Sequence, residues 1–520
     1  MRAVHGLILA AFLLLAGCSG APTTGTDAPG TTVAEQTDAG AAEQTDVGAT
    51  EQTEDGAAEQ TDTGTTEQTD TPGEPGVGAV DRADPATDRL GWEAGYWANE
   101  SLSVTNGDGL NASEREAVVA RAMARVEVLR DREFRESVPV DIISRAEFQN
   151  ESAPSLTESL RTFDNAKYEA MFLVGEDRSS IQAQLDNQGE NVLGYFDPRN
   201  DTIKLVADSG QPQLSGERTL GHELVHALQD QYYNLSAITG ETRDESNGQS
   251  ALIEGDARTV GLAYESRCGT DWDCLSAPSD SPSLSDIHVG IYLLNFFPYS
   301  DGPGLISELR ERDGWDAVGA AFDDPPASAE QAIYPERYTD ARDSPATVSL
   351  TDTATDGWTR VRPESPIPGF ERANYGRLGQ SGLSAMFAYT VFDQSGPGLV
   401  PPRSVTSSDQ SDPVNYDYPV TDGWAGDRLH VYENVDAGAN ETAYVWRLRW
   451  DSATDAGDFA DGYRRLLGYW GASPVDGREN VQTIPEDDSF GDAFRVTRDG
   501  DTVTVVNAPT VDDLDAVHQP

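Results

Sequence analysis

Two histidines four residues apart in a helix-forming segment restrict this chain more than any other feature of its sequence. The segment TLGHELVHALQDQYYNL (219–235) contains His222, Glu223 and His226, with no Gly or Pro between Glu223 and Tyr233. Side chains four apart lie on one face of an α-helix, so both imidazoles can bind one zinc ion. Glu223 lies one step round the helix from His222, where its carboxylate can take a proton from a water molecule on the metal. We therefore expect a zinc-binding helix over 219–235.

A zinc ion needs a further protein ligand, and a segment downstream offers a carboxylate. The segment SALIEGDARTVGLAY (250–264) has apolar residues at helical spacing and places Glu254 among them. A carboxylate in an apolar stretch costs several kcal/mol unless it is paired or binds a metal. We expect Glu254 to be the third ligand, with Glu245 and Asp256 as alternatives. The competing interpretation is a solvent-exposed carboxylate near the N-terminus of a helix.

The charge of the chain excludes some partners. Its formal net charge is −54, so nucleic acid and anionic membrane surfaces would repel it. Among its 36 basic residues, Lys167 and Lys204 are the only lysines. An acidic, lysine-poor surface keeps a protein hydrated at very high salt, where charge repulsion is screened, and we interpret the surface as halophilic, of archaeal type. A disordered acidic chain is the alternative, but 37% hydrophobic residues and nine Trp argue for a packed interior.

The N-terminus has the features of an export signal. In MRAVHGLILAAFLLLAGC, Arg2 precedes an apolar run that suits a signal peptide and is too short to span a bilayer. The ending LAGC resembles a lipobox, which implies that residues 1–17 are a lipoprotein signal peptide and that Cys18 is lipidated. In residues 18–88 the triplet EQT recurs every eight residues and almost nothing could form a core. We predict that this stretch is a disordered, low-complexity tether.

The two remaining cysteines, Cys268 and Cys274, lie close together in RCGTDWDC. A short-loop disulfide suits a protein outside the cytosol. A metal-binding pair is the alternative, but no second Cys/His pair lies nearby in the sequence. We predict a disulfide between Cys268 and Cys274.

Folded structure of the α+β class is predicted from about residue 89, in two parts. In residues 89–345 the patterns predict helices at 111–132, from about 156, at 219–235 and at 250–264, a strand at 138–144 and a hairpin at 191–206. In residues 346–520 they predict a smaller α+β unit with helices at 381–392 and 455–467, a strand at 445–450 and a hairpin at 494–508 around an Asp-Gly turn.

The sequence resembles the gluzincin class of metallopeptidases, to which thermolysin-like enzymes belong. Their pattern is HExxH on one helix and a Glu on a following helix, and His222, Glu223, His226 and Glu254 match it in order. The motifs HELVHALQDQ, LIEGDA, FPYSDGPG and IYPERY are also similar to an uncharacterised group of haloarchaeal and bacterial surface lipoproteins. The resemblance covers residues 110–345 and implies a zincin-like domain that binds Zn²⁺.

The resemblance also implies roles for further residues. Thermolysin-like enzymes place an Asp four residues after the second His, where it supports the first His, and Asp230 occupies that position. Gluzincins use a Tyr or His to stabilise the oxyanion. Tyr299 in FPYSDGPG is the first candidate, followed by His288 and Tyr334. The chain departs from the thermolysin pattern at Arg258, where that pattern has an Asp, so details of the subfamily are not transferred.

These observations predict a zinc metalloendopeptidase, anchored by lipid to the extracellular face of the cell membrane, that hydrolyses peptide or protein substrates. The alternative is a lipid-anchored surface protein with a binding or structural role, in which zinc only stabilises the fold. An open coordination position favours the enzyme, whereas a fourth protein ligand favours the structural site.

Overall fold

The structure, a computed structural model, describes most of the chain from residue 85 onward. The described residues are 85–152, 156–189, 192, 194–207, 210–214, 216–275, 287–364, 373–434 and 441–519. The predicted signal peptide (1–17), Cys18 and nearly all of the predicted tether (18–88) lie outside them. The described part is a mixed α+β structure, as predicted. None of its helices is long and apolar enough to cross a membrane.

The described part begins with a two-stranded sheet and a long helix. β1 (Trp92–Glu93) pairs antiparallel with β2 (Tyr96–Trp97), and α2 follows at Ala112–Arg130. Asn111 caps α2, because its side chain accepts a hydrogen bond from Glu114 N while the Glu114 carboxylate accepts one from Asn111 N. The helix predicted here is confirmed.

A three-stranded sheet precedes the helix that contains the HExxH motif. β3 (Val140–Ile143) runs parallel to β5 (Thr202–Val206), and β4 (Gly194–Asp197) pairs antiparallel with β5. The strand order is β3-β5-β4, so β4 is an edge strand, and β4 and β5 are the predicted hairpin. The helices between β3 and β4 are α3 (Arg145–Ser152), α4 (Glu158–Ala170) and α5 (Ser180–Gly189).

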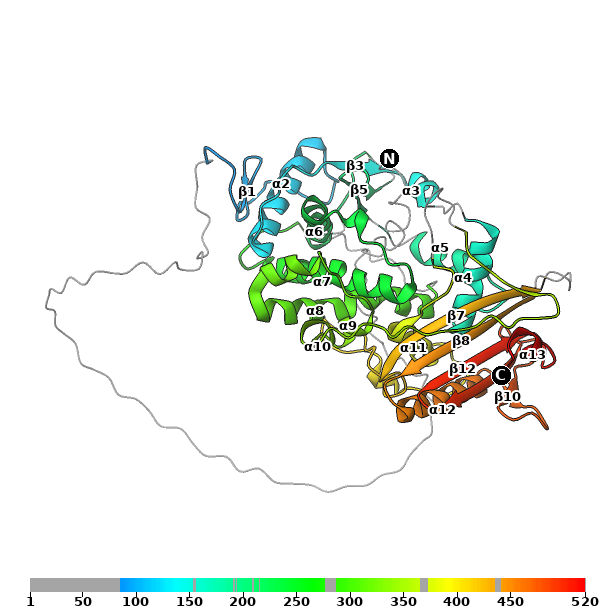
Figure 1. Cartoon of the computed structure of the whole chain (residues 1–520). Helices are drawn as coiled ribbons and strands as arrows, with labels where there is room; N and C mark the ends of the chain where they lie inside the picture. The colour runs from blue at the N-terminus through cyan, green and yellow to red at the C-terminus, as the bar shows by residue number, and fades with distance from the viewer. Residues whose placement is uncertain are drawn as a thin grey trace, which may run out of the picture. The chain divides into compact units, whose positions relative to one another are not determined.

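Three long helices, drawn in green in Figure 1, form the centre of the fold, and the second of them packs against both of the others. They are α6 (Glu217–Tyr233), α7 (Arg243–Arg267) and α8 (Val289–Ala321). α6 is the predicted motif helix. α7 begins before residue 250 because Thr242 caps its first turn by accepting a hydrogen bond from Glu245 N. α8 was not predicted and includes two prolines, Pro298 and Pro303. Short helices follow α6 and α8: η2 (Leu235–Ala237), α9 (Glu330–Ile333) and α10 (Glu336–Thr339).

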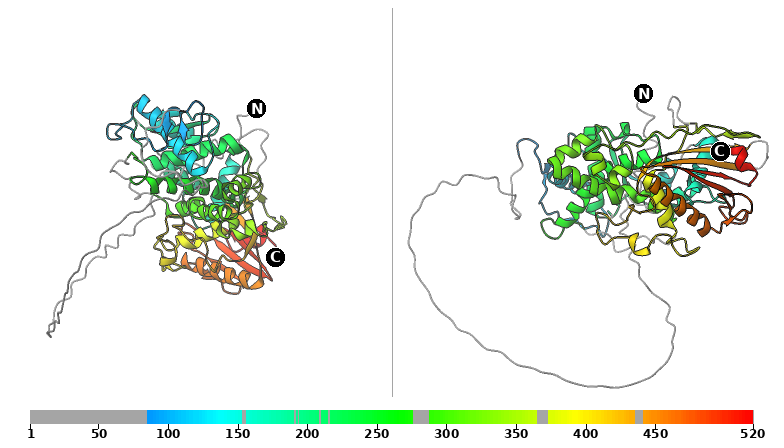
Figure 2. Two further views of the ribbon diagram at one scale, coloured as in Figure 1. Left: turned by 90° about the vertical axis from the view of Figure 1, so that its left-hand side faces the viewer. Right: turned by 60° about the horizontal axis from the view of Figure 1, so that its bottom comes forward.

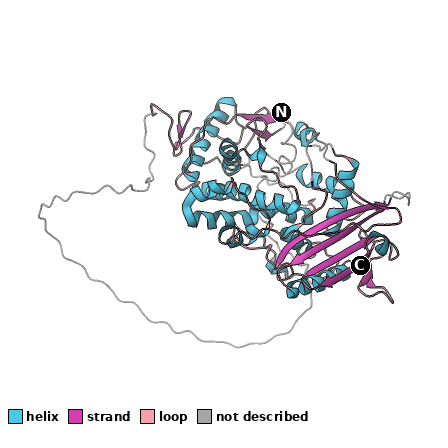
Figure 3. Cartoon of the chain, viewed as in Figure 1, coloured by secondary structure: helices cyan, strands magenta, loops and turns pink. Residues whose placement is uncertain are grey.

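The larger sheet, drawn in magenta in Figure 3, is built from residues after 346. Its strand order is β6-β7-β8-β12-β11-β10-β9, with antiparallel neighbours. The strands are β6 (Trp358–Arg360), β7 (Trp424–Asn434), β8 (Glu441–Trp450), β9 (Ser473–Pro474), β10 (Val481–Thr483), β11 (Ala493–Asp499) and β12 (Thr502–Ala508). The accompanying helices are α11 (Gly379–Tyr389), η3 (Pro402–Ser404), α12 (Ala453–Tyr469) and α13 (Asp513–Val517). The two helices, the strand and the hairpin predicted here are confirmed.

One hydrophobic core joins the two predicted parts. It contains Leu252 of α7 and Phe297 of α8 together with Phe387 of α11 and Trp446 of β8. Figure 2 shows the same contact between the green helices and the yellow and orange elements from two further directions. The largest hydrophobic core therefore extends across the division predicted at residue 345, whereas smaller cores lie entirely on either side of it.

Helices α7 and α8 cross at Gly255 and Gly302. A β-carbon added to Gly255 would lie 2.4 Å from the Gly302 carbonyl carbon, and one added to Gly302 would lie 2.4 Å from Ala251 O. Neither position has space for a side chain, because real β-carbons do not approach other atoms so closely. Glu254 is the neighbour of Gly255, and Tyr299 lies one helical turn before Gly302. The crossing therefore brings these two side chains into one region.

The crossing predicts opposite effects of alanine at two glycines of α8. Gly302→Ala should lower the free energy of unfolding by about 1–3 kcal/mol, because the added methyl group overpacks the helix contact. Gly304→Ala is the matched control: it is exposed, no atom lies within 4 Å of its added β-carbon, and alanine favours a helix by about 0.5–1 kcal/mol. Denaturant unfolding in molar salt measures both. Equal stability of the two variants would contradict the close contact.

Candidate metal centre

The first turn of α6 is held by a buried cluster of charges. The Glu217 carboxylate accepts hydrogen bonds from Arg121 and Arg125 of α2, each at 2.5 Å. It also accepts one from the Tyr264 hydroxyl of α7 at 2.7 Å and one from Leu275 N at 2.8 Å. A buried carboxylate is costly without such donors. The cluster therefore fixes α6, with its metal-binding residues, relative to α2 and α7.

Three potential ligand atoms converge between α6 and α7. His222 Nε2 lies 3.1 Å from His226 Nε2 and 3.2 Å from Glu254 Oε2. His226 Nε2 lies 3.4 Å from the same Glu254 oxygen. Ligands bound to one zinc ion at about 2.0–2.1 Å in tetrahedral geometry are separated by about 3.3–3.4 Å. The three side chains predicted as ligands are therefore brought together at a spacing close to that of a zinc site.

Gln229 orients one of the histidines. The Gln229 side-chain nitrogen donates to Ile253 O at 3.0 Å and to Asp256 Oδ2 at 3.1 Å, so its oxygen must be the atom that faces His226. His226 Nδ1 lies 3.0 Å from that oxygen and is therefore the protonated nitrogen. Its Nε2, directed at the cluster, is left to bind a metal. Sequence reasoning missed Gln229, although its position three residues after His226 places it on the same face of α6.

Asp230 does not have the role that the resemblance implied. Its carboxylate accepts a hydrogen bond from Leu235 N at 2.7 Å, just beyond the end of α6. Burial raises the pKa of Asp230 to about 6, with Asp201 adding to the shift and the Leu235 hydrogen bond opposing it. Among the described residues outside the ligand cluster, Gln229 is the side chain that holds a histidine of the motif by a hydrogen bond. The histidine that it holds is the second one, His226, and not the first.

Glu223 has one carboxylate oxygen bound and one without a partner. Oε2 accepts a hydrogen bond from Phe196 N of β4 at 3.0 Å. Oε1 is buried and has no hydrogen-bond partner among the described residues. Burial raises the pKa of Glu223 to about 8, with Glu254 adding to the shift and His226 and the Phe196 hydrogen bond opposing it. A group of this kind can exchange a proton near neutral pH.

Tyr299 lies beside the cluster on α8. Its ring stacks on that of His222, with centroids 6.1 Å apart and planes 24° from parallel. Burial, together with Glu254 and Glu223, raises the pKa of the Tyr299 hydroxyl well above its usual range. The hydroxyl nevertheless makes no hydrogen bond of ordinary geometry with any described residue. It remains a proton donor next to Glu254.

The protonation states of the three candidate ligand side chains depend on one another. Burial lowers the pKa of His222. Burial also disfavours the charged form of His226, but the Glu254 carboxylate outweighs it and raises the pKa of His226 to about 9. Burial opposes ionisation of Glu254, yet the two histidines bring its pKa to about 2. The negative charge of Glu254 is thus balanced by a proton on His226, which a bound cation would replace.

The other sequence candidates lie away from these atoms. Glu245 is in the first turn of α7 and accepts a hydrogen bond from Glu241 N. Asp256 pairs with Arg130 at 2.8 Å and with Gln229. His288 caps α8 by accepting from Ile291 N. Tyr334 donates to Asp417 at 2.7 Å. Neither Glu245 nor Asp256 joins the ligand cluster.

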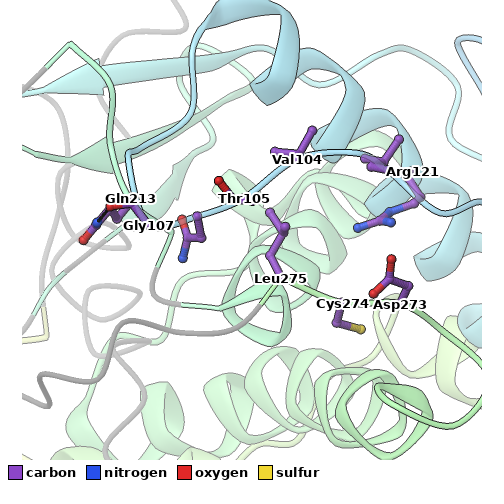
Figure 4. A pocket seen from close by; sticks show the side chains of 10 residues that line it. Val104, Thr105, Gly107, Arg121, Gln213, Asp273, Cys274 and Leu275 are labelled. Carbon is purple, nitrogen blue, oxygen red and sulfur yellow. Dashed lines mark hydrogen bonds between the residues drawn. The ribbon is translucent and has the colours of Figure 1, made fainter.

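Cys268 and Cys274 form a disulfide at the end of α7. Beside it lies the hollow of about 390 Å³ shown in Figure 4, lined by side chains that include Val104, Arg121 and Leu275. None of the three ligand residues lines this hollow. Residues 276–286, which continue from its wall, lie outside the described residues, so we assign no ligand to it.

The donor set fits zinc. Two imidazole nitrogens and one carboxylate oxygen are a known zinc combination, and such three-ligand sites keep a fourth position for water or substrate. In the described part of the chain, no other His, Cys, Asp or Glu joins the three ligand atoms. Two buried atoms without partners, Glu223 Oε1 and the Tyr299 hydroxyl, belong to side chains close enough to Glu254 to interact with it electrostatically. The arrangement can polarise a bound group and move a proton next to it.

Removal of the Gln229 side-chain amide should weaken zinc binding. Gln229→Met keeps the volume but no longer holds His226, so we expect zinc affinity to fall by about 10–100-fold, as is typical for partners of metal ligands. A competition titration with a zinc chelator measures the change. Asp230→Asn is the matched control and should bind zinc as the wild type does. A comparable loss in Asp230→Asn, with none in Gln229→Met, would restore the role implied by the resemblance.

The C-terminal part of the chain matches a known family. Residues 366–518 match a family described as a domain of unknown function, DUF8575. The matched segment includes α11, α12 and most of the larger sheet, whereas the metal cluster on α6 and α7 precedes it. No curated protein and no solved structure matches the chain.

Proposed function

We propose that this protein is a zinc-dependent metallopeptidase with a zincin-like domain, in which His222, His226 and Glu254 bind Zn²⁺. The observation that supports it best is the combination of three ligand atoms 3.1–3.4 Å apart with two unpartnered polar groups beside them. A site that only held zinc for stability would not need a carboxylate oxygen and a hydroxyl left without partners. Peptide hydrolysis uses both kinds of group.

Glu223 is the proton carrier in this proposal. When bound, zinc polarises the substrate carbonyl and makes water more acidic. Glu223 Oε1 accepts a proton from the attacking water and later delivers it to the leaving amine. Its pKa of about 8 in the absence of metal falls when a dication is near, which favours the ionised form as base. The hydrogen bond from Phe196 N to Oε2 holds the carboxylate in place for both transfers.

Tyr299 stabilises the negative charge that develops on the carbonyl oxygen. Its hydroxyl is protonated at all physiological pH values because burial and the two carboxylates raise its pKa. A neutral donor fixed in a buried site stabilises an oxyanion without having to reorganise. Stacking on His222 and the packing of α8 restrict the orientation of the ring.

The edge strand β4 provides a place for a peptide substrate. β4 ends the order β3-β5-β4, and its Phe196 already contacts Glu223. An extended peptide can add to a sheet edge through main-chain hydrogen bonds. At β4, whose four residues are buried, it would have to displace the contacts that cover the strand. A peptide in this position would have its scissile bond near Glu223.

A structural zinc site is the alternative, and the deep burial of the ligands favours it. His226 is 0% exposed and Glu254 is 2% exposed. Structural zinc sites, however, close the coordination sphere with a fourth protein ligand, and the described residues supply only three of the usual ligand types. A catalytic zinc site is therefore better supported than a structural one.

The proposed location is the outer face of the cell membrane. It depends on the N-terminal sequence, with its signal peptide, Cys18 and tether, and the Cys268–Cys274 disulfide is compatible with an extracellular protein. The net charge of −54 argues against nucleic acid as a partner.

Replacement of the proton carrier should abolish turnover without loss of metal. Glu223→Gln should retain one zinc ion per chain and lose about 10²–10⁴-fold in peptide hydrolysis, the usual contribution of a general base. Zinc content and hydrolysis of casein or a peptide library are measured in molar salt. Glu311→Gln, an exposed change on α8, serves as the charge-matched control. Equal hydrolysis by wild type and Glu223→Gln would refute the mechanism, and zinc without hydrolysis in either would favour the structural site.

Loss of the oxyanion donor should affect kcat more than zinc affinity. Tyr299→Phe removes only the unpartnered hydroxyl, so folding and metal content should be kept while kcat falls by about 10²–10³-fold. Tyr338→Phe, whose hydroxyl donates to Asp324 O elsewhere on the protein, is the control. An unchanged kcat in Tyr299→Phe would assign oxyanion stabilisation to another residue.

A further inference from the structure

A second group of carboxylates lies far along the chain from the metal centre. Glu169 in the last turn of α4, Glu176 in the loop after it and Asp492 before β11 each offer an oxygen, and these atoms all lie within 4.8 Å of one another. Glu169 is 6% exposed and Asp492 is 4% exposed. Glu176 is exposed, so the cluster opens to solvent on one side.

No basic side chain neutralises this cluster. Among the described residues, no Lys or Arg lies within ion-pair distance of Glu169, Glu176 or Asp492. Like charges held this close need a counter-ion or protons. The protein itself supplies no such counter-ion at this position in the described residues.

Asn507 on β12 adds an independent indication of a ligand. It is 1% exposed and directed into the cluster, because its side-chain nitrogen donates to Asp492 Oδ2 at 2.7 Å. Its side-chain oxygen is buried and has no hydrogen-bond partner. A buried amide oxygen without a donor is costly. Rotation of the amide would direct this oxygen, which is a good cation ligand, toward the carboxylates.

The surrounding packing prevents the carboxylates from moving apart. Glu176 N donates to Ser489 O at 2.9 Å, and a β-carbon on the preceding residue, Gly175, would clash with that carbonyl. Phe172 packs on Phe490, with ring centroids 5.0 Å apart. The loop after α4 and the loop before β11 are therefore joined, and Figure 1 shows α4 (cyan) next to the larger sheet.

We propose that Glu169, Glu176, Asp492 and Asn507 bind a calcium ion. Only oxygen atoms converge here, and calcium accepts six to eight oxygen ligands in flexible geometry. Zinc prefers nitrogen or sulfur ligands, and magnesium prefers to keep most of its water. Water molecules at the exposed Glu176 side complete the coordination.

The ion would join two parts of the chain. Glu169 and Glu176 precede the segment that matches DUF8575, whereas Asp492 and Asn507 lie within residues 366–518. A ligand that binds only the folded state stabilises it in proportion to its occupancy. Calcium should therefore raise the melting temperature of the protein. The site shares no residue with the metal centre, so it can be tested whatever the outcome for the proposed peptidase.

The test is calcium binding by the whole chain in molar NaCl, where screening suppresses nonspecific attraction to the acidic surface. After chelator treatment and addition of zinc, calorimetry with CaCl₂ should show one saturable site, and Tm should rise. Glu176 is exposed, so Glu176→Gln should leave the fold intact. It should weaken calcium affinity by at least about tenfold, because affinity follows the charge of the ligands. Asp458→Asn, an exposed carboxylate on α12, should bind calcium as the wild type does.

Terbium provides a second measurement, because Tyr444 and Tyr463 lie near Glu169. Tb³⁺ luminescence sensitised by these rings should be displaced by calcium, and Asp492→Asn should abolish it. Absence of a saturable calcium site in the wild type would overturn the proposal. Equal calcium affinity in wild type, Glu176→Gln and Asp458→Asn would also overturn it, since binding would then be nonspecific. A site filled by zinc but not by calcium would refute the chemical class.

Discussion

Helices α7 and α8 approach very closely at Gly255 and Gly302. The backbone of each helix lies where a side chain at the glycine of the other helix would have to be. Most of the metal centre follows from this contact. Glu254 is adjacent to the crossing and is thereby directed at the histidines of α6, while Tyr299, one turn earlier on α8, is placed over His222. Larger residues at the crossing would separate the helices by several ångströms. The ligand and the hydroxyl would then no longer share one site.

The position of α6 depends on buried charges rather than on close backbone contact. Glu217 binds Arg121 and Arg125 of α2, and Asp256 of α7 binds Arg130 of α2 and Gln229 of α6. Buried ion pairs add little net stability, since desolvation offsets most of their attraction. These ion pairs fix the positions of α2, α6 and α7 relative to one another, because a shift of any one helix would leave buried charges unpaired. The hydrogen bond that His226 Nδ1 donates to the Gln229 side-chain oxygen then fixes the orientation of the His226 ring.

Local sequence patterns were enough to predict the helices and hairpins that are specified by residues close together in the chain. The capping box at Asn111, the HExxH helix and the hairpins with polar turns each depend on residues close in the chain. α8 was missed because Pro298 and Pro303 normally interrupt helices, and here packing against α7 and α11 stabilises the helix around them. The larger sheet was predicted only in part. Its short edge strands have too few residues for an alternating pattern, and the longer strand β7 was also not predicted.

Spacing and composition were enough to select the three side chains that the structure brings together, whereas the partners that support them could not be predicted. His222 and His226 are fixed by helical periodicity, and Glu254 stands out as a carboxylate among apolar residues. The choice between Gln229 and Asp230 depends on where α7 crosses α6, since only the crossing places Ile253 O and Asp256 beside Gln229. That crossing is a long-range property, and one sequence does not specify it.

The cluster on α6 and α7 and the cluster around Glu169 and Asp492 differ in their side chains, and the difference indicates different chemistry. Around His222 and His226, nitrogen donors predominate, and Glu223 Oε1 and the Tyr299 hydroxyl, which can exchange or donate a proton, have no partner. Around Glu169 and Asp492 only oxygen converges, and the one unpartnered atom identified there is the amide oxygen of Asn507, which can neither donate nor take a proton at ordinary pH. A site for chemistry requires groups that change protonation during a reaction. A site that only holds an ion requires none, so we assign turnover to the first cluster and stabilisation to the second.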